Sequence, residues 1–177
     1  MELPLKSLAV ANRFVEISNE SGSRDLTLMK LLKVVYFAHG WHLGLTEKPL
    51  INEFFQAWQF GPVAPDVYHN FKHVGASPIL SPAFTFIDFN LGGAIDDMKF
   101  EAPSVPHEPG MDVFLNKIWE TYGKLSAFQL SELTHQEGTP WHKAWYENGG
   151  STRKNTPILD EDIRDYFKKK IDAAKSA

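Results

Sequence analysis

The stretch between residues 27 and 45 carries apolar side chains on almost every side of the helix that its periodicity predicts. The polar residues that interrupt it are Lys30, Lys33, His39 and His42. A helix that is apolar nearly all round must be covered on most sides by other elements. The sequence therefore predicts a mainly α, compact multi-helix domain around a central buried helix. Gly40 and Gly44 lie one turn apart in this helix and allow another element to cross it closely.

Helical patterns also recur before and after this central stretch. Apolar residues three to four positions apart mark each helix, with capping residues, prolines and glycines at the ends. The expected helices lie at about 7–20, 65–74, 111–122, 126–135, 139–148 and 160–171. Val113 is one of the apolar residues expected to anchor the helix at 111–122, and Phe128 is an apolar member of the helix at 126–135. One or two short β-strands are expected at 53–60 and 155–159, and these two segments are the best candidates to pair.

Residues 76–109 form a Pro- and Phe-rich insert within what we expect to be one domain spanning residues 1–177. Binding residues often lie on loops that a rigid scaffold positions. Phe84, Phe86 and Phe89 are the candidate partner-binding residues, because an extended chain does not turn all of them inward. The alternative is that the insert folds back and seals these rings against the helical core.

The composition narrows the class of protein. The chain has no cysteine, which excludes disulfides and a catalytic thiol and fits a reducing compartment. The first residues lack the layout of a signal peptide, and no apolar run approaches the roughly 20 residues that span a bilayer. A net charge of −4 gives no attraction to nucleic acid. We therefore expect a cytoplasmic protein that does not bind membranes, and the charge argues against nucleic acid as its partner.

Histidines are the remaining candidates for chemistry, because the sequence carries no phosphate-binding loop, nucleophile elbow or zinc-protease motif. His69 and His73 are spaced to present two nitrogens to a metal, but no third ligand is fixed nearby. His135, Glu137 and His142 cluster around Trp141 without a nucleophile or a visible substrate pocket. We therefore expect no enzyme activity, no catalytic residue, no metal and no cofactor.

Three segments together resemble a known family. Residues 28–41 end in Tyr-Phe-Ala-His-Gly-Trp, and residues 53–63 read Glu-x-x-x-Ala-Trp-x-x-Gly-Pro-Val. Leu-Thr-His at 133–135 is followed by Pro-Trp at 140–141. This combination resembles the Panacea domain, the SocA-like antitoxin family also labelled phage-associated GepA-like proteins. The resemblance covers residues from about 7 to 147. It implies an antitoxin that neutralises a cognate protein toxin, usually encoded beside it, by direct binding.

The residues that carry this resemblance also have structural interpretations. They are Trp41, Glu53, Trp58, Gly61, Pro62, Val63, Tyr68, His135 and Trp141. Gly61 and Pro62 fit a tight turn after a strand. We expect Trp41, Trp58 and Trp141 to be mutual core contacts, with Glu53 pairing with a histidine or capping a helix. The motif thus indicates the fold more directly than it indicates the contact surface.

Other functions stay open at this level. One alternative is a histidine-based or metal-dependent hydrolase, and a second is a DNA-binding regulator with a basic helical face in a dimer. Within the antitoxin interpretation, the resemblance leaves open whether the chain blocks the toxin or delivers it to a cellular protease. It also leaves open whether the chain acts as a homodimer.

Overall fold

The computed structural model describes residues 2–88 and 99–176 of the chain. The helices are α1 (Ser7–Glu20), α2 (Leu28–Thr46), α3 (Pro65–Phe71), α4 (Pro109–Tyr122), α5 (Ala127–His135), α6 (Pro140–His142) and α7 (Asp160–Lys175). A 3₁₀ turn at Lys72–Val74 extends α3, and a π-helical turn at Lys143–Glu147 extends α6. The strands are β1 (Phe55–Trp58), β2 (Gly61–Val63), β3 (Thr85–Asp88), β4 (Lys99–Glu101) and β5 (Pro157–Ile158). The predicted mainly α class is confirmed, with more short strands than the sequence indicated.

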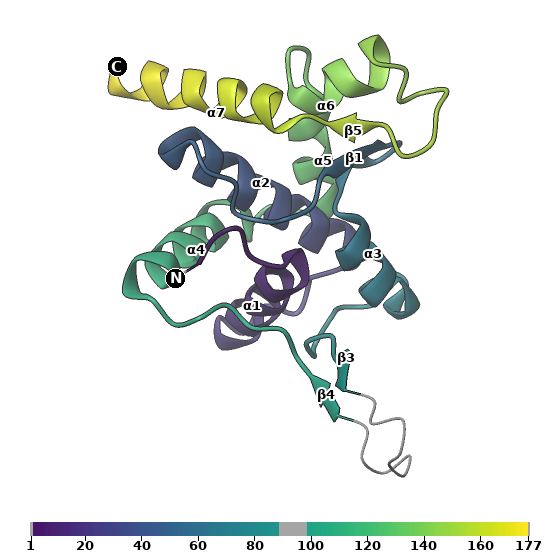
Figure 1. Ribbon diagram of the computed structural model, residues 1–177, viewed down its shortest axis with the longest axis vertical. Coiled ribbons are helices and arrows are strands. Elements are labelled where there is room, and N and C mark those ends of the chain that lie inside the picture. Colours follow the sequence, from purple (N-terminus) through teal and green to yellow (C-terminus); the bar gives the residue numbers. More distant parts are fainter. Residues whose placement is uncertain (1, 89–98, 177) are drawn as a thin grey trace.

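Helix α2 is the buried centre that the sequence predicted. It lies between α7 on one side and α1 and α4 on the other (Figure 1). Its polar side chains all find partners: Lys30 with Asp25 (2.7 Å), Lys33 with the Pro62 carbonyl (3.1 Å), His39 with Asp160 (3.2 Å) and His42 with the Lys48 carbonyl (2.8 Å). These contacts offset the cost of burying polar groups and tie the central helix to four other segments. Gly40 and Gly44 face α7, which confirms the predicted close crossing.

Strand β1 lies at the centre of a small antiparallel sheet with the order β2-β1-β5. Phe55 pairs with Ile158, which confirms the predicted pairing of the two extended segments. Trp58 pairs with Gly61, so Gly61–Val63, expected as a turn only, forms the returning strand of a hairpin. Pro62 is tolerated there because β2 is an edge strand, where a missing N–H costs no ladder bond.

The insert at 76–109 contains a second hairpin. Strands β3 and β4 pair antiparallel, with Phe86 opposite Phe100, and the hairpin projects from the helical body (Figure 1). Sequence reasoning expected an extended segment here but not its pairing with a second strand.

Two residues that the sequence placed among the apolar members of their helices are exposed in the structure. The Val113 side chain on α4 is 70% exposed, and Phe128 on α5 is 67% exposed. Apolar spacing alone does not separate a buried stripe from an exposed neighbour of that stripe.

No helix in the described part of the chain combines the length and apolar character that crossing a bilayer requires.

Candidate partner-binding surfaces

The turn that joins β1 to β2 is held by side chains from three helical segments. The Trp58 carbonyl accepts from the indole N–H of Trp141 (2.9 Å), and the Phe60 carbonyl accepts from the hydroxyl of Ser131 (3.0 Å). The Gln59 carbonyl lies 3.1 Å from His135 Nε2, and the Pro62 carbonyl accepts from the ammonium of Lys33 at 3.1 Å. A surface turn normally leaves such carbonyls to water. Here α2, α5 and α6 fix the conformation of the turn, which presents Phe60 outward with 64% of its surface exposed.

Lys33 reaches this turn from inside the protein. Its side chain is buried, and burial lowers the pKa of its ammonium to about 7. Among the described residues, no carboxylate lies within ion-pair distance of it. Gly61 has a φ of 109°, and a Cβ there would lie 2.4 Å from Lys33 Cε and 2.8 Å from Thr134 Oγ1. Both the backbone conformation and the space therefore require glycine at this position.

Aromatic rings complete the support of the turn. His135 packs on Trp141 with centroids 3.8 Å apart, and Trp58 meets Tyr68 edge-on at 4.7 Å. Most of the motif residues thus form one cluster, which we call the turn cluster: Trp58, Gly61, Pro62, Val63, Tyr68, His135 and Trp141. The expected contact between Trp58 and Trp141 is confirmed by the hydrogen bond from the indole to the carbonyl.

Trp41 does not join the turn cluster, so its expected contact with Trp58 and Trp141 is wrong. Its indole N–H donates to the Tyr122 hydroxyl at 2.7 Å, and its ring meets Phe167 at 5.3 Å. Trp41 lies eight residues after Lys33 on α2, which is about 12 Å along a helix. The axial rise therefore places Trp41 beyond the turn, against α7.

Glu53 caps a helix, one of the two roles expected for it. Its carboxylate accepts the backbone N–H of Asp66 at 3.2 Å, in the first turn of α3, and the hydroxyl of Ser7, the first residue of α1. Burial raises the pKa of this carboxyl group. The positive ends of two helices thus share one acceptor.

The histidine candidates do not form a catalytic arrangement. Both ring nitrogens of His135 face carbonyl oxygens, at 2.6 Å from Ser131 O and 3.1 Å from Gln59 O, so neither points to a substrate. His142 packs on Tyr146, and His69 packs on Tyr68. In the part of the chain that the structure describes, no group of three or more potential ligands is placed to hold a metal ion.

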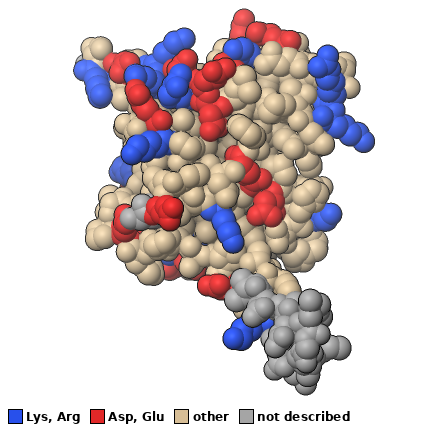
Figure 2. All heavy atoms as spheres, viewed as in Figure 1, with Lys and Arg blue, Asp and Glu red and all other residues tan. Residues whose placement is uncertain are grey.

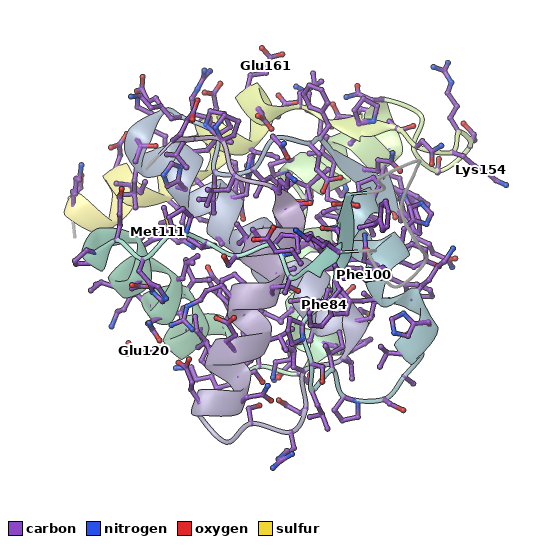
Figure 3. All side chains as sticks on the ribbon, turned by 60° about the horizontal axis from the view of Figure 1, so that its bottom comes forward. Phe84, Phe100, Met111, Glu120, Lys154 and Glu161 are labelled. Carbon is purple, nitrogen blue, oxygen red and sulfur yellow. The ribbon has the colours of Figure 1, made fainter. Side chains whose placement is uncertain are left out.

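The β3–β4 hairpin carries exposed aromatic rings. Phe84 is 59% exposed and Phe100 60%, and both are labelled in Figure 3. Phe86 is 44% exposed, and its ring meets that of Phe100 edge-on with centroids 5.6 Å apart. Phe89 lies outside the described residues. Sequence reasoning missed Phe100, although the alternation of Lys99, Phe100 and Glu101 is a strand signal.

Asn12, from α1, fastens the base of this hairpin. Its buried amide donates to Ala83 O and to Pro103 O, both at 2.9 Å, and accepts from Ala83 N at 2.8 Å. One side chain therefore ties the segments that enter and leave the hairpin to the helical core. Nothing in the sequence around Asn12 signals this role, because its partners lie more than 70 residues away.

Comparisons with known proteins agree with the motif residues. The family described as "Antitoxin SocA-like, Panacea domain" matches residues 31–142. The chain belongs to this Panacea family. The Antitoxin SocA of Caulobacter vibrioides (strain NA1000 / CB15N) is 32% identical over 162 residues, which cover 90% of this chain and 81% of that protein. No solved structure matches the chain.

Membership of the Panacea family supports an antitoxin role. It suggests a non-enzymatic activity and implies a toxin as partner in general. The matched residues 31–142 include the whole turn cluster, from Trp58 to Trp141, and both strands of the β3–β4 hairpin.

Proposed function

We propose that this chain neutralises a cognate protein toxin by direct binding, as one domain spanning residues 1–177 and in the cytoplasm. The observation that carries the proposal is the β3–β4 hairpin, which projects from the body with Phe84, Phe86 and Phe100 exposed. Aromatic anchors supply much of the energy of protein interfaces when a partner buries them.

The attachment of the hairpin favours binding further. An isolated two-stranded hairpin is marginally stable in water. Here the amide of Asn12 fastens both of its ends, so the rings are presented on a preorganised support. Preorganisation lowers the entropy that binding costs. The hairpin therefore has the two properties that a contact surface needs, exposed anchors and a fixed base.

The competing functions have less support. A hydrolase would need a free base, whereas the nitrogens of His135 are occupied by carbonyl groups. A DNA-binding regulator would need a concentrated basic face, whereas basic and acidic residues are interspersed over the face shown in Figure 2. Binding to a protein partner requires neither feature.

Neutralisation by steric block and delivery of the toxin to a cellular protease predict different outcomes. A block leaves the amount of toxin in the cell unchanged, whereas delivery lowers it when the antitoxin is present.

Sedimentation of the purified chain and of its complex would show whether a homodimer takes part.

The test uses co-expression with the toxin encoded by the adjacent reading frame. Phe84→Ser with Phe86→Ser should abolish rescue of growth and binding of the purified toxin while the protein stays folded. The control, Phe54→Ser with Phe128→Ser, removes two phenylalanines that are equally exposed elsewhere and should still rescue. If neither wild type nor control binds the toxin, the proposed function is wrong. If the hairpin variant still binds, the contact surface lies elsewhere.

A further inference from the structure

A groove of about 790 Å³ runs between strand β1 and the loop that follows the π-helical turn. On one side it is lined by β1 and the adjoining turn, and on the other by the loop at residues 150–155. The side chains that we use below are Trp58, Gln59, His69, Trp145, Arg153 and Lys154. Trp58 belongs to the turn cluster, so the fixed turn forms one wall of the groove.

The opposite wall is held in place by backbone contacts. Gly150 N donates to Ala144 O at 3.0 Å, and Arg153 N donates to Gly149 O at 2.9 Å. A Cβ at Gly150 would lie 2.9 Å from both the Ala144 carbonyl oxygen and the Trp145 Cα, so the loop packs directly on the π-helical turn. The groove therefore has two ordered walls.

The charge of the groove is opposite to that of the chain. Arg153, Lys154 and His69 line it and no Asp or Glu does, although the whole chain carries a net charge of −4. Within the described residues, neither Arg153 nor Lys154 has a carboxylate at ion-pair distance. Both are exposed, and Lys154 extends from the edge of the molecule (Figure 3). These two cations are therefore available to a negatively charged partner.

Aromatic surface lies beside the two cations. Trp58 and Trp145 are both half-buried, and both line the groove. The indole N–H of Trp58 already donates to the side chain of Gln56 at 2.9 Å, which leaves its ring for apolar contact. Trp145 stacks on Trp141 with centroids 5.4 Å apart, which fixes its orientation. The groove thus combines positive charge with rigid apolar faces.

We propose that this groove docks an acidic segment of the toxin partner. Carboxylates of the segment lie against Arg153 and Lys154, and an adjacent apolar side chain packs on Trp145. The inference rests on the proposed function, because the toxin supplies the segment. Charge complementarity favours an acidic peptide over nucleic acid, since a polyanion needs several neutralised phosphates and the groove offers two permanent cations on an acidic protein.

The test measures the affinity of the purified full-length chain for the toxin that wild type neutralises, at low and at high salt. Arg153→Glu with Lys154→Glu should weaken binding at least about tenfold at low salt and remove most of the salt dependence. The matched control is Arg24→Glu with Lys124→Glu, which changes the net charge equally at exposed positions outside the groove. The control should keep the affinity and salt dependence of wild type.

A second variant tests the opposite sign. Gln59→Lys adds a cation to the groove at an exposed position and should tighten binding several-fold at low salt. The proposal is overturned if the Arg153→Glu, Lys154→Glu variant binds the toxin with the affinity of the control. It is also overturned if Gln59→Lys weakens toxin binding while its thermal melt is unchanged. A third outcome also overturns it: wild type binds a fluorescein-labelled single-stranded DNA, and the Arg153→Glu, Lys154→Glu variant loses that binding but keeps its affinity for the toxin. A wild type that does not bind the toxin instead refutes the proposed function, and this inference with it.

Discussion

The Phe167 ring occupies the space that a side chain on Gly40 would need. A Cβ atom at Gly40 would lie 2.1 Å from Phe167 Cε2, well inside any allowed contact. Phe167 is 1% exposed and belongs to α7, so it has no free space into which to move. The absence of a side chain at Gly40 therefore sets how closely α7 approaches the central helix.

We expect Gly40→Ala to destabilise the protein by about 1–3 kcal/mol, because overpacking outweighs the gain of about 1 kcal/mol in helix propensity. Gly110→Ala is the control, since Gly110 is also helical and a Cβ there meets nothing within 4 Å. The control should be neutral or slightly stabilising. Thermal melts compare the two, and a Gly40→Ala protein that melts with the control would show that the helix crossing is not tight.

The buried Lys33 predicts a dependence of stability on pH. Its folded pKa is about 7, against 10.5 in the unfolded chain. Between these values the unfolded state binds more protons, so the free energy of unfolding should rise with pH by up to about 1.4 kcal/mol per unit. Below pH 7 both states are protonated, and the folded state bears the full cost of the buried ammonium.

Lys33→Met removes this cost and should stabilise the protein at pH 7 and below. The difference between its free energy of unfolding and that of wild type should shrink toward pH 10.5. Lost hydrogen bonding to the Pro62 carbonyl offsets about 1 kcal/mol of the gain. Lys30→Met serves as the contrast, because Lys30 is equally buried but paired with Asp25 and should lose stability. Urea denaturation across this pH range measures both. A difference that does not change with pH would mean that Lys33 stays protonated.

The turn cluster predicts unequal effects at two tryptophans. Trp141→Phe removes a buried indole N–H and leaves the Trp58 carbonyl without its donor, which should cost about 2–4 kcal/mol. Trp41→Phe removes a similar bond, but its partner is the Tyr122 hydroxyl, which can rotate toward water. We expect the second change to cost about 1 kcal/mol or less. Equal losses in chemical denaturation would argue against a special role for the turn.

The helices could be predicted from the sequence because their signals are local. The bounds predicted for α1 and α2 agree closely with the structure, and the Ser126 cap of α5 is present as a full capping box. Burial around each helix depends on what packs there, which is a tertiary property. For that reason the apolar spacing of Val113 and Phe128 did not reveal that both side chains are exposed.

The candidate sites were less accessible to sequence reasoning. The motif residues indicated the family, but not that four carbonyl groups of one turn meet side chains from residues 29 to 83 positions away. The groove combines Trp58 with Arg153, and the pairing of β1 with β5 helps to bring these residues together. That pairing was predicted from the sequence, but the side chains that it places around one groove were not, because their positions depend on the packing of the loop at residues 150–155.

Asn12 provides a prediction that separates the position of the hairpin from its aromatic rings. Asn12→Asp is nearly isosteric and can still accept from Ala83 N. It cannot donate to Ala83 O and Pro103 O, and it places a carboxylate against both oxygens. The hairpin should therefore detach at its base, with a loss of about 2–4 kcal/mol in stability and faster hydrogen exchange of the β3 and β4 amides.

Loss of this anchor should weaken toxin binding although every phenylalanine of the hairpin is retained, because a freed hairpin must be ordered again on binding. Asn70→Asp is the control, since the hydrogen bonds that the Asn70 amide makes to described residues stay within α3. It should leave melting, exchange and affinity close to wild type. If Asn12→Asp exposes the hairpin amides to exchange while toxin affinity is unchanged, the toxin is recognised by a surface other than this hairpin. If exchange is also unchanged, contacts other than the Asn12 amide hold the hairpin to the core.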